Sequence, residues 1–168
     1  MIRPERPTDF QAVRLVHLSA FPGPDEADLV ERLRANGKAT ISLVAEQDDR
    51  VIGHVLFSPV QIAGSQVELR GLGLAPVAVL PAYQRQGAGI GLIQLGLKMA
   101  HLRGHDFVVV LGDPSYYQRF GFRPAGEFDL SNEYGVGDEF MAIELRRGCL
   151  VGVAGLVQYA AEFKELGV

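Results

Sequence analysis

The stretch AYQRQGAGIGLI, residues 82–93, joins two segments of different periodicity. The run before it, VELRGLGLAPVAVL (residues 67–80), predicts a β-strand, and residues 89–102 place apolar side chains at helical spacing. The N-terminus of a helix leaves its first N–H groups unpaired and carries the positive end of the helix dipole. Glycine leaves the backbone bare, so an anion can approach these N–H groups closely. The order of strand, QRQGAG and helix therefore predicts a cradle for phosphate or pyrophosphate.

A purely structural role is the alternative for these glycines, in which Gly87 and Gly89 make a tight turn and let the helix lie close to the sheet. Two known phosphate motifs fit poorly. The P-loop pattern GxxxxGK[ST] does not occur, and in a GxGxxG motif the third glycine would not fall at Gly91. A nucleotide-phosphate protein is therefore the weakest of the functional hypotheses.

The pattern on both sides of this joint predicts helices first, then a strand meander, then strand, helix and strand. The expected strands are 2–6, 40–47, 51–62, 67–80, 106–113 and 139–145, and the expected helices are 9–20, 26–35, 89–102 and 114–120. Asp25 is expected to cap the second helix. For residues 150–168 the sequence leaves two alternatives, a short strand at about 153–159 or a loose helix. This order indicates an α/β (α+β) domain with a mixed sheet.

Length and composition indicate one globular domain over residues 1–168, because 48% of the residues are apolar and 21% are charged. A net charge of −4 argues against a broad nucleic-acid-binding face. The four histidines are scattered, so no metal site is expected. The N-terminus lacks a signal-peptide core and no run is long enough to cross a membrane, so we expect a cytoplasmic monomer or homodimer. Cys149 is expected to be an ordinary buried thiol.

Three local motifs resemble the GNAT superfamily of N-acetyltransferases. Residues 84–89, QRQGAG, match its signature [Q/R]-x-x-G-x-[G/A], and residues 79–81, VLP, match the Val-x-Pro end of the preceding strand. Residues 117–122, YQRFGF, are similar to its later Tyr-x-x-x-Gly-Phe segment. The resemblance covers about residues 1–146 and leaves 147–168 as a C-terminal extension. VLGDPSYYQRFGF and GLVQYAAEF are similar to a bacterial predicted-acetyltransferase branch of the superfamily.

This resemblance implies a single layer with a mixed, mostly antiparallel central sheet, flanked by helices and splayed between its fourth and fifth strands. It implies acetyl-CoA as donor and an amine, most simply the primary amine of a small molecule, as acceptor. The amine would attack the thioester directly, without a covalent enzyme intermediate. No GxSxG nucleophile motif occurs, in agreement with direct attack.

The implied cofactor-binding residues fall in two backbone segments. The loop and helix start would bind the CoA pyrophosphate through Gln84, Arg85, Gln86, Gly87, Ala88, Gly89 and Ile90. Arginine suits phosphate because its guanidinium is a fork of donors, although a solvated loop charge is the alternative for Arg85. Pro76 has no ladder donor and belongs at a bulge or an edge. The backbone of Val77, Ala78 and Val79 would pair with the pantetheine arm like an added strand, and one N–H would polarise the acetyl carbonyl.

The implied catalytic residue is Tyr117, because a phenol with a pKa of ~10 is protonated at neutral pH and can donate to the departing thiolate. A tyrosine that only packs on the core is the alternative, and Tyr116 is expected to be a packing residue or a neighbour of the pantetheine. The family's strand glutamate falls at Gly73, so it is missing. Glu68 or His54 acting through water would be substitutes, yet a lone strand histidine is more often structural.

The sequence does not determine which amine is the acceptor. Asp25, Glu26 and Asp28 would attract a cationic amine, or they only complement the dipole of their helix. A protein or peptide amine is a second possible acceptor class. The missing strand glutamate also keeps a non-catalytic acyl-CoA sensor or interaction module as an alternative.

Overall fold

The computed structural model describes all residues from 1 to 168 and contains two compact units. The first unit consists of Met1–Ser58, Ala75–Met99 and Ala160–Val168, and the second of Pro59–Leu74 and Ala100–Tyr159. The strands are β1 (Ile2–Pro4), β2 (Ile41–Gln47), β3 (Arg50–Ala63), β4 (Gly71–Val79), β5 (Phe107–Leu111), β6 (Arg123–Pro124), β7 (Leu130–Asn132), β8 (Phe140–Glu144) and β9 (Gly155–Gln158). The α-helices are α1 (Phe10–Ala20), α2 (Asp25–Ala35), α3 (Ala88–Leu102), α4 (Pro114–Tyr117) and α5 (Ala161–Leu166). Short 3₁₀ helices are η1 (Pro7–Asp9), η2 (Pro81–Tyr83), η3 (Gln118–Phe120) and η4 (Ala125–Phe128).

Seven of the nine strands follow the order β1-β2-β3-β4-β5-β8-β6, and off this path β9 pairs with β3 and β7. Strands β1, β2 and β3 pair antiparallel, as do β5, β8 and β6, whereas β4–β5 and β7–β9 are parallel. The predicted α/β class with a mixed sheet and flanking helices is confirmed. No helix combines the length and the apolar character that a bilayer crossing requires.

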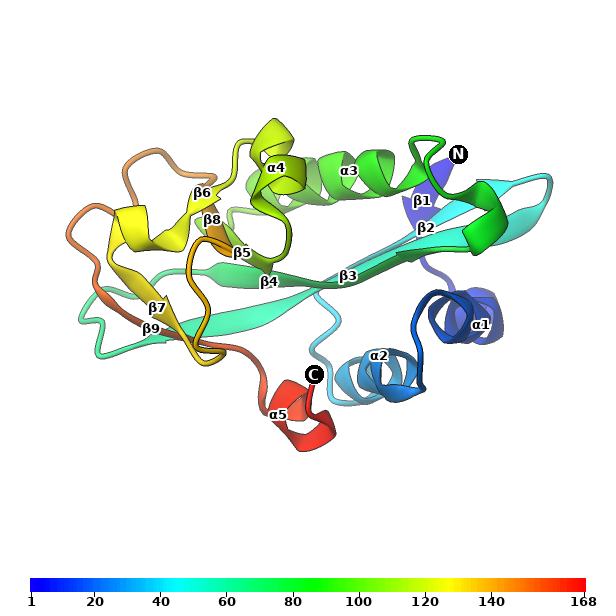
Figure 1. The fold of residues 1–168 in the computed structure, drawn as a ribbon, viewed down its shortest axis with the longest axis horizontal. Coiled ribbons are helices and arrows are strands. Elements are labelled where there is room, and N and C mark those ends of the chain that lie inside the picture. The colour runs from blue at the N-terminus through cyan, green and yellow to red at the C-terminus, as the bar shows by residue number, and fades with distance from the viewer. The chain divides into compact units, whose positions relative to one another are not determined.

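In the first unit, helices cover both faces of β1, β2 and the start of β3 (Figure 1). Helices α1 and α2 lie on one face and bury an apolar stripe, which comprises Val13, Val16, Leu29, Val30 and Leu33. Helix α3 lies on the opposite face. A Cβ on Gly91 would lie 2.5 Å from Cδ1 of Ile2, and one on Gly96 would lie 2.2 Å from the Phe57 ring. The close approach of helix and sheet thus depends on these two glycines and not on Gly87.

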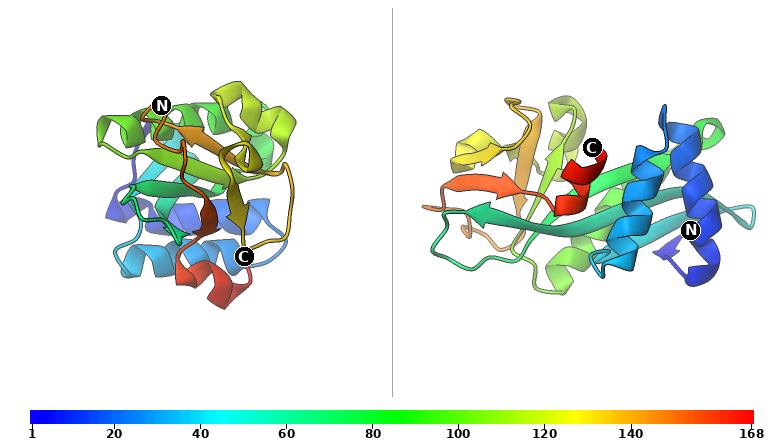
Figure 2. Two further views of the ribbon diagram at one scale, coloured as in Figure 1. Left: turned by 90° about the vertical axis from the view of Figure 1, so that its left-hand side faces the viewer. Right: turned by 90° about the horizontal axis from the view of Figure 1, so that it is seen from below.

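The C-terminal helix α5 belongs to the first unit and lies beside α2 (Figure 2). The buried carboxylate of Glu162 accepts hydrogen bonds from Lys38 (2.8 Å) and Asn36 (2.7 Å) just after α2. Burial alone would raise the pKa of Glu162, but these hydrogen bonds lower it below its usual range. The tail therefore contains both structures left open by the sequence, first strand β9 and then helix α5.

In the second unit, β5 pairs with β8 over its full length, and β7 runs parallel to β9. Their apolar side chains form a core that comprises Val60, Phe107, Val109, Ala125, Leu130, Phe140, Ala142, Cys149, Leu150 and Val157. The Cys149 thiol donates to the Asp106 carbonyl (3.2 Å), and burial raises the pKa of this thiol to about 11. The expectation that Cys149 is a buried thiol is confirmed.

Two details of the expected helices differ. Helix α2 begins at Asp25, with Pro24 before it, so Asp25 is the first helical residue and not the cap. Proline has no side-chain oxygen for capping, and the acidic first turn complements the helix dipole instead. Asp28 is paired with Arg14 at 2.9 Å, which favours its structural interpretation. Phe122 in the segment after α4 is buried, whereas Phe120 is only half-buried.

Candidate active site

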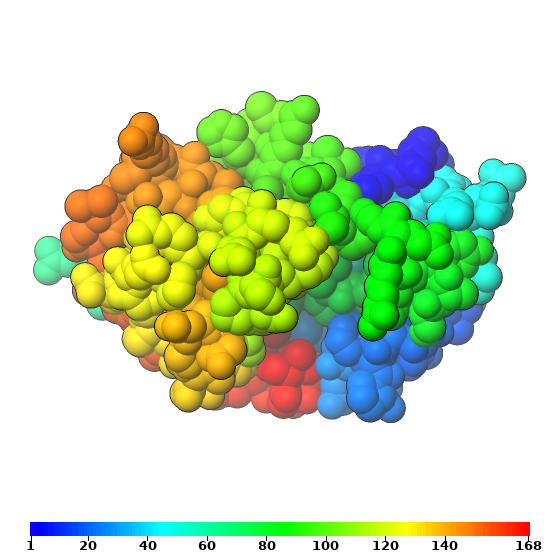
Figure 3. Space-filling view, turned by 45° about the horizontal axis from the view of Figure 1, so that its top comes forward, coloured from blue at the N-terminus to red at the C-terminus, as the bar shows by residue number.

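The loop between η2 and α3 has the geometry of an anion cradle. Arg85 (φ 62°) and Gly87 (φ 94°) both adopt left-handed backbone conformations within three residues. Alternation of right- and left-handed residues turns successive N–H groups toward one point, which is the basis of anion-binding nests. A Cβ on Gly87 would meet no atom within 4 Å, so the space in front of the loop is open. In the space-filling view this green segment lies on the outer surface (Figure 3).

The start of α3 supplies donors to this cradle. The N–H of Gly91 donates to the Gly87 carbonyl at 3.0 Å, which is the first hydrogen bond of the helix. The N–H groups of Ala88, Gly89 and Ile90 precede it and have no intrahelical acceptor. They lie at the positive end of a helix of 15 residues, where an anion is favoured.

Side-chain hydrogen bonds hold the cradle in place. Nε2 of Gln84 donates to the Val79 carbonyl at 2.9 Å, which ties the loop to the end of β4. Nε2 of Gln86 donates to the Ala82 carbonyl at 3.4 Å. The exposed Arg85 has no ion-pair partner among the described residues, so its guanidinium is free to meet a ligand. The structure thus brings the loop and the end of β4 together, as the sequence predicted.

Strand β4 changes its pairing along its length. Its parallel ladder with β5 covers only Gly71–Gly73, which face Phe107–Val109. The strand then continues through Pro76 to Val79, with Ala78 buried and its neighbours Val77 and Val79 half-buried. The ladder to β5 ends before the proline that lacks a donor, in agreement with the splayed sheet expected from the resemblance.

The two candidate tyrosines lie together on α4 in the second unit. The Asp113 carboxylate accepts a hydrogen bond from the Ser115 N–H (2.9 Å) and so caps this short helix. The Tyr117 ring packs over bare backbone, because a Cβ on Gly112 would lie 2.3 Å from its Cε2. Burial raises the pKa of Tyr117 to about 12 and also raises the pKa of Tyr116. The Tyr117 phenol is therefore protonated at neutral pH and is able to act as an acid.

A residue absent from the predicted site, Tyr159, occupies the place of the family's strand glutamate. A Cβ on Gly73 would lie 2.4 Å from Cε1 of Tyr159 and 3.0 Å from Cγ1 of Val60. The space over this strand position is thus filled by an aromatic ring from the C-terminal tail. The sequence gives no local signal for this contact, because it depends on where β9 pairs in the sheet.

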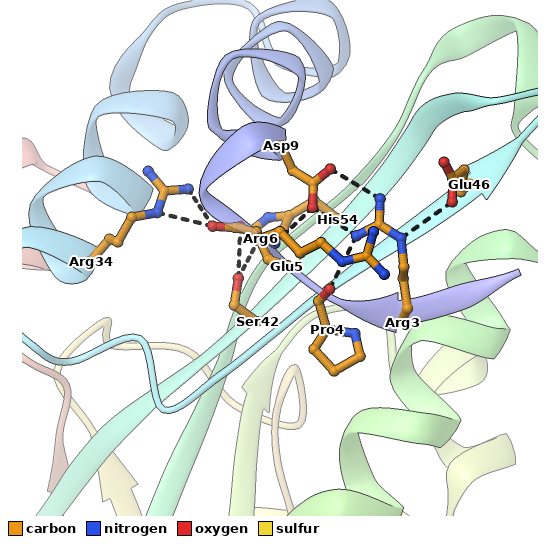
Figure 4. A network of polar contacts seen from close by, with 9 residues as sticks. All are labelled: Arg3, Pro4, Glu5, Arg6, Asp9, Arg34, Ser42, Glu46 and His54. Atoms are coloured by element: carbon orange, nitrogen blue, oxygen red, sulfur yellow. Dashed lines mark hydrogen bonds and ion pairs between the residues drawn. The ribbon is translucent and has the colours of Figure 1, made fainter.

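His54 is fully buried, and both of its ring nitrogens are occupied. Figure 4 shows its contacts with Glu5 and Ser42. Nε2 lies 2.9 Å from the Glu5 carboxylate and 2.8 Å from Oγ of Ser42, and Nδ1 lies 2.8 Å from Nε2 of His17. The Glu5 carboxylate also pairs with Arg34 at 2.8 Å. These contacts confirm a structural role for His54 and leave it no free nitrogen for a substrate. Glu68 is exposed in the β3–β4 connection, before β4 begins.

This network predicts a specific acid sensitivity. Burial lowers the pKa of His17 to about 3, and its Nδ1 is buried without a partner. Below the ordinary histidine pKa of about 6.5 the unfolded chain gains a proton that the folded chain does not bind, so stability falls as the pH falls. We expect His17→Leu to reduce this slope between about pH 6 and 4 by up to about 1.4 kcal/mol per pH unit. Urea unfolding at several pH values measures the slope.

The matched control is His101→Leu, which removes an exposed histidine at the end of α3. This variant should keep the slope of the parent protein. An unchanged slope in His17→Leu would contradict a neutral, buried His17 in the folded state.

Comparisons with known proteins agree with this geometry. A family model described as acetyltransferase (GNAT) domain matches residues 1–125. The uncharacterized N-acetyltransferase YhbS of Escherichia coli is 39% identical over 167 residues, which cover 98% of this chain and 99% of that protein. A second E. coli protein, the uncharacterized N-acetyltransferase YjhQ, is 36% identical over 80% of this chain and 76% of its own length.

Solved structures give the same result. The crystal structure of E. coli YhbS in complex with CoA has a TM-score of 0.92 and 38% identity, and covers 98% of this chain and 91% of that one. A GNAT family acetyltransferase from Brucella melitensis in complex with acetyl-CoA has a TM-score of 0.80 and 37% identity, with 97% of both chains covered. The anion cradle at α3, the interrupted β4–β5 ladder and these relatives together show that the chain belongs to the GNAT family of N-acetyltransferases.

Proposed function

We propose that this N-acetyltransferase transfers the acetyl group of acetyl-CoA to the primary amine of a small molecule by direct attack. The observation that carries the proposal is the open cradle before α3, with left-handed Arg85 and Gly87 and unpaired N–H groups. It is supported by two relatives at 37–38% identity whose structures contain CoA or acetyl-CoA. Residues 1–168 act in this proposal as one functional domain, as a monomer or a homodimer.

The donor binds along two backbone segments in this proposal. The N–H groups from Gln84 to Ile90 donate hydrogen bonds to the pyrophosphate, and Arg85 adds its guanidinium from the outside of the loop. The segment Val77 to Val79 follows the end of the β4–β5 ladder, so its backbone groups pair with the pantetheine arm. One N–H of this segment polarises the acetyl carbonyl and stabilises the tetrahedral oxyanion. Tyr116, half-buried beside Tyr117, contacts the thiol end of the arm.

Tyr117 acts as the general acid. The lone pair of the neutral amine attacks the acetyl carbonyl, the carbon–sulfur bond breaks, and the phenol protonates the departing thiolate. No carboxylate on β4 is available as base, because β4 contains no acidic residue and Gly73 stands at the position of the family's glutamate. The proton lost by the attacking nitrogen therefore leaves through water and restores the Tyr117 phenol.

The same absent glutamate favours a second candidate, a non-catalytic acyl-CoA sensor that binds the donor without turning it over. One experiment separates the candidates. Release of the CoA thiol from acetyl-CoA is measured over amino acids, polyamines, aminoglycosides and short peptides, together with calorimetric binding of acetyl-CoA.

Acetyl-CoA binding with thiol release for a small amine is the expected result. Release only with peptides would place the acceptor on a protein or peptide. Binding without release over the whole panel would identify a sensor, and absence of acetyl-CoA binding would refute both candidates.

A further inference from the structure

Strands β7 and β9 run parallel and end side by side in the second unit. Asn132 is paired with Val157 at this end, so the next residues, Glu133 and Tyr134 on one strand and Tyr159 on the other, leave the pair together. The Tyr134 and Tyr159 rings meet nearly edge to face, with centroids 5.7 Å apart and planes at 71°. The Tyr134 and Tyr159 rings, with Glu133 beside them, thus form an aromatic corner just beyond the ends of the two strands.

The loop that carries Glu133 and Tyr134 is held in a defined conformation. Oδ1 of Asn132 accepts hydrogen bonds from the N–H groups of Tyr134 (2.9 Å) and Val136 (3.3 Å), and its Nδ2 donates to the Val136 carbonyl (2.9 Å). Oε1 of Glu133 accepts from the Tyr159 N–H at 3.1 Å, which holds the carboxylate beside the Tyr159 ring. The corner is therefore preorganised, and binding a ligand there would require little ordering of the loop.

The charge of this corner is negative and uncompensated. The exposed Glu133 carboxylate has no ion-pair partner among residues 1–168. Burial, together with the smaller effect of the Glu133 charge, raises the pKa of Tyr134 to about 12, so the phenol stays neutral. Burial also raises the pKa of Tyr159, and the neighbouring Tyr134, Tyr117 and Glu133 contribute smaller increases to the same pKa. Neutral aromatic faces beside an unpaired carboxylate are the environment that binds organic cations.

The corner lies close to the proposed general acid, because the neighbouring Tyr117 contributes to the raised pKa of Tyr159. The Tyr159 ring covers Gly73, the last residue of β4 that pairs with β5. Tyr117, the proposed general acid, rests on Gly112, directly after β5. Two tyrosine rings thus lie on glycines of neighbouring strands, one from the acid helix and one from the aromatic corner.

We propose that Glu133, Tyr134 and Tyr159 bind a positively charged group of the acceptor that does not react. The substrate is then a small amine with a second cationic group, such as an α,ω-diamine. This inference rests on the proposed acetyltransferase function and names its acceptor class. One ammonium stays protonated against Glu133 and the two rings. The other nitrogen, neutral when it reacts, attacks the acetyl carbonyl, and the thiolate leaves with the Tyr117 proton. The nitrogen's lost proton returns to Tyr117 through water, so the bound ammonium takes no part in the proton balance.

The test compares 1,4-diaminobutane with 1-aminobutane, which lacks only the second amine, in thiol release from acetyl-CoA by the full chain. We expect Glu133→Gln to raise KM for the diamine by about 5- to 30-fold, as the loss of a cation site of this kind predicts, with kcat nearly unchanged. KM for 1-aminobutane and for acetyl-CoA should not change. Tyr134→Leu should raise the diamine KM by about 3- to 10-fold, and Tyr134→Phe, which keeps the ring, should not.

Glu139→Gln is the matched control, because Glu139 is an exposed carboxylate in the loop before β8 and has no ion pair. Thiol release that continues with an unchanged diamine-to-monoamine ratio in Glu133→Gln would overturn this inference and leave the acetyltransferase function intact. If neither amine is turned over, binding of 1,4-diaminobutane to the CoA-saturated protein is measured by calorimetry and tests the inference. Binding lost in Glu133→Gln supports the corner, and absence of binding to the parent overturns it. Failure to bind acetyl-CoA would instead refute the proposed function.

Discussion

Gly87→Glu is expected to weaken acetyl-CoA binding by about 100-fold or more. The new side chain enters the open space before the cradle, where a Cβ meets no atom within 4 Å, so it would occupy the ligand's place. Its carboxylate would oppose a pyrophosphate at close range, where two like charges repel by about 1 kcal/mol in water and several times more near a protein surface. It would also take the helix N-terminus as its own anion partner. Calorimetric titration with acetyl-CoA measures the loss.

Backbone strain contributes to this variant, because a residue with a Cβ is disfavoured at φ 94°. Gly37→Glu controls for it, since Gly37 also has a positive φ (71°) and open surroundings but ends α2 instead of beginning a helix. The control should share the strain and keep full acetyl-CoA affinity. Equal affinity in both variants and the parent would show that the cradle does not bind the donor.

Tyr117→Phe is expected to lower kcat for thiol release by about 10²- to 10⁴-fold, which is the usual contribution of a positioned general acid. The phenylalanine keeps the ring contacts with Tyr116, Phe120 and Phe122 and removes only the hydroxyl proton. Since the pKa of Tyr117 is about 12, the parent protein holds this proton throughout the neutral range. KM for acetyl-CoA should change little, because the donor is bound mainly by the backbone. Steady-state thiol release with the best amine of the screen provides both constants.

The control for this variant is Tyr83→Phe, which makes the same change on η2. It should keep the parent kcat, and thermal unfolding of both variants should match the parent. A kcat within about two-fold of the parent in Tyr117→Phe would remove Tyr117 from the acid role, since a general acid contributes far more than that. The acetyl-CoA cradle would stand unaffected by that result.

Local sequence patterns were sufficient to predict the backbone geometry of the candidate donor cradle. The QRQGAG loop, the helix after it and the proline in β4 each act through backbone geometry within a few residues, namely positive φ, unpaired N–H groups and a missing donor. The positions of the longer strands and helices could be predicted for the same reason, because period and turn residues are local properties, whereas the short strands β6 and β7 were not predicted. The predicted role of each cradle residue in binding acetyl-CoA stays a prediction.

The proposed acceptor side could not be predicted, because its residues meet only through distant pairing. Tyr159 reaches Gly73 because β9 pairs with β3 and β7, and short strands such as β7 have too few residues to show a period. Likewise, His54 contacts His17 and Glu5, which lie in separate parts of the sequence. These contacts favour a structural role for a residue that the sequence had offered as a candidate base. The sequence alone determined the backbone chemistry of the donor cradle, because the causes lie within one turn of chain. Only the tertiary structure decided which side chains replace the absent glutamate, because long-range strand pairing places them there.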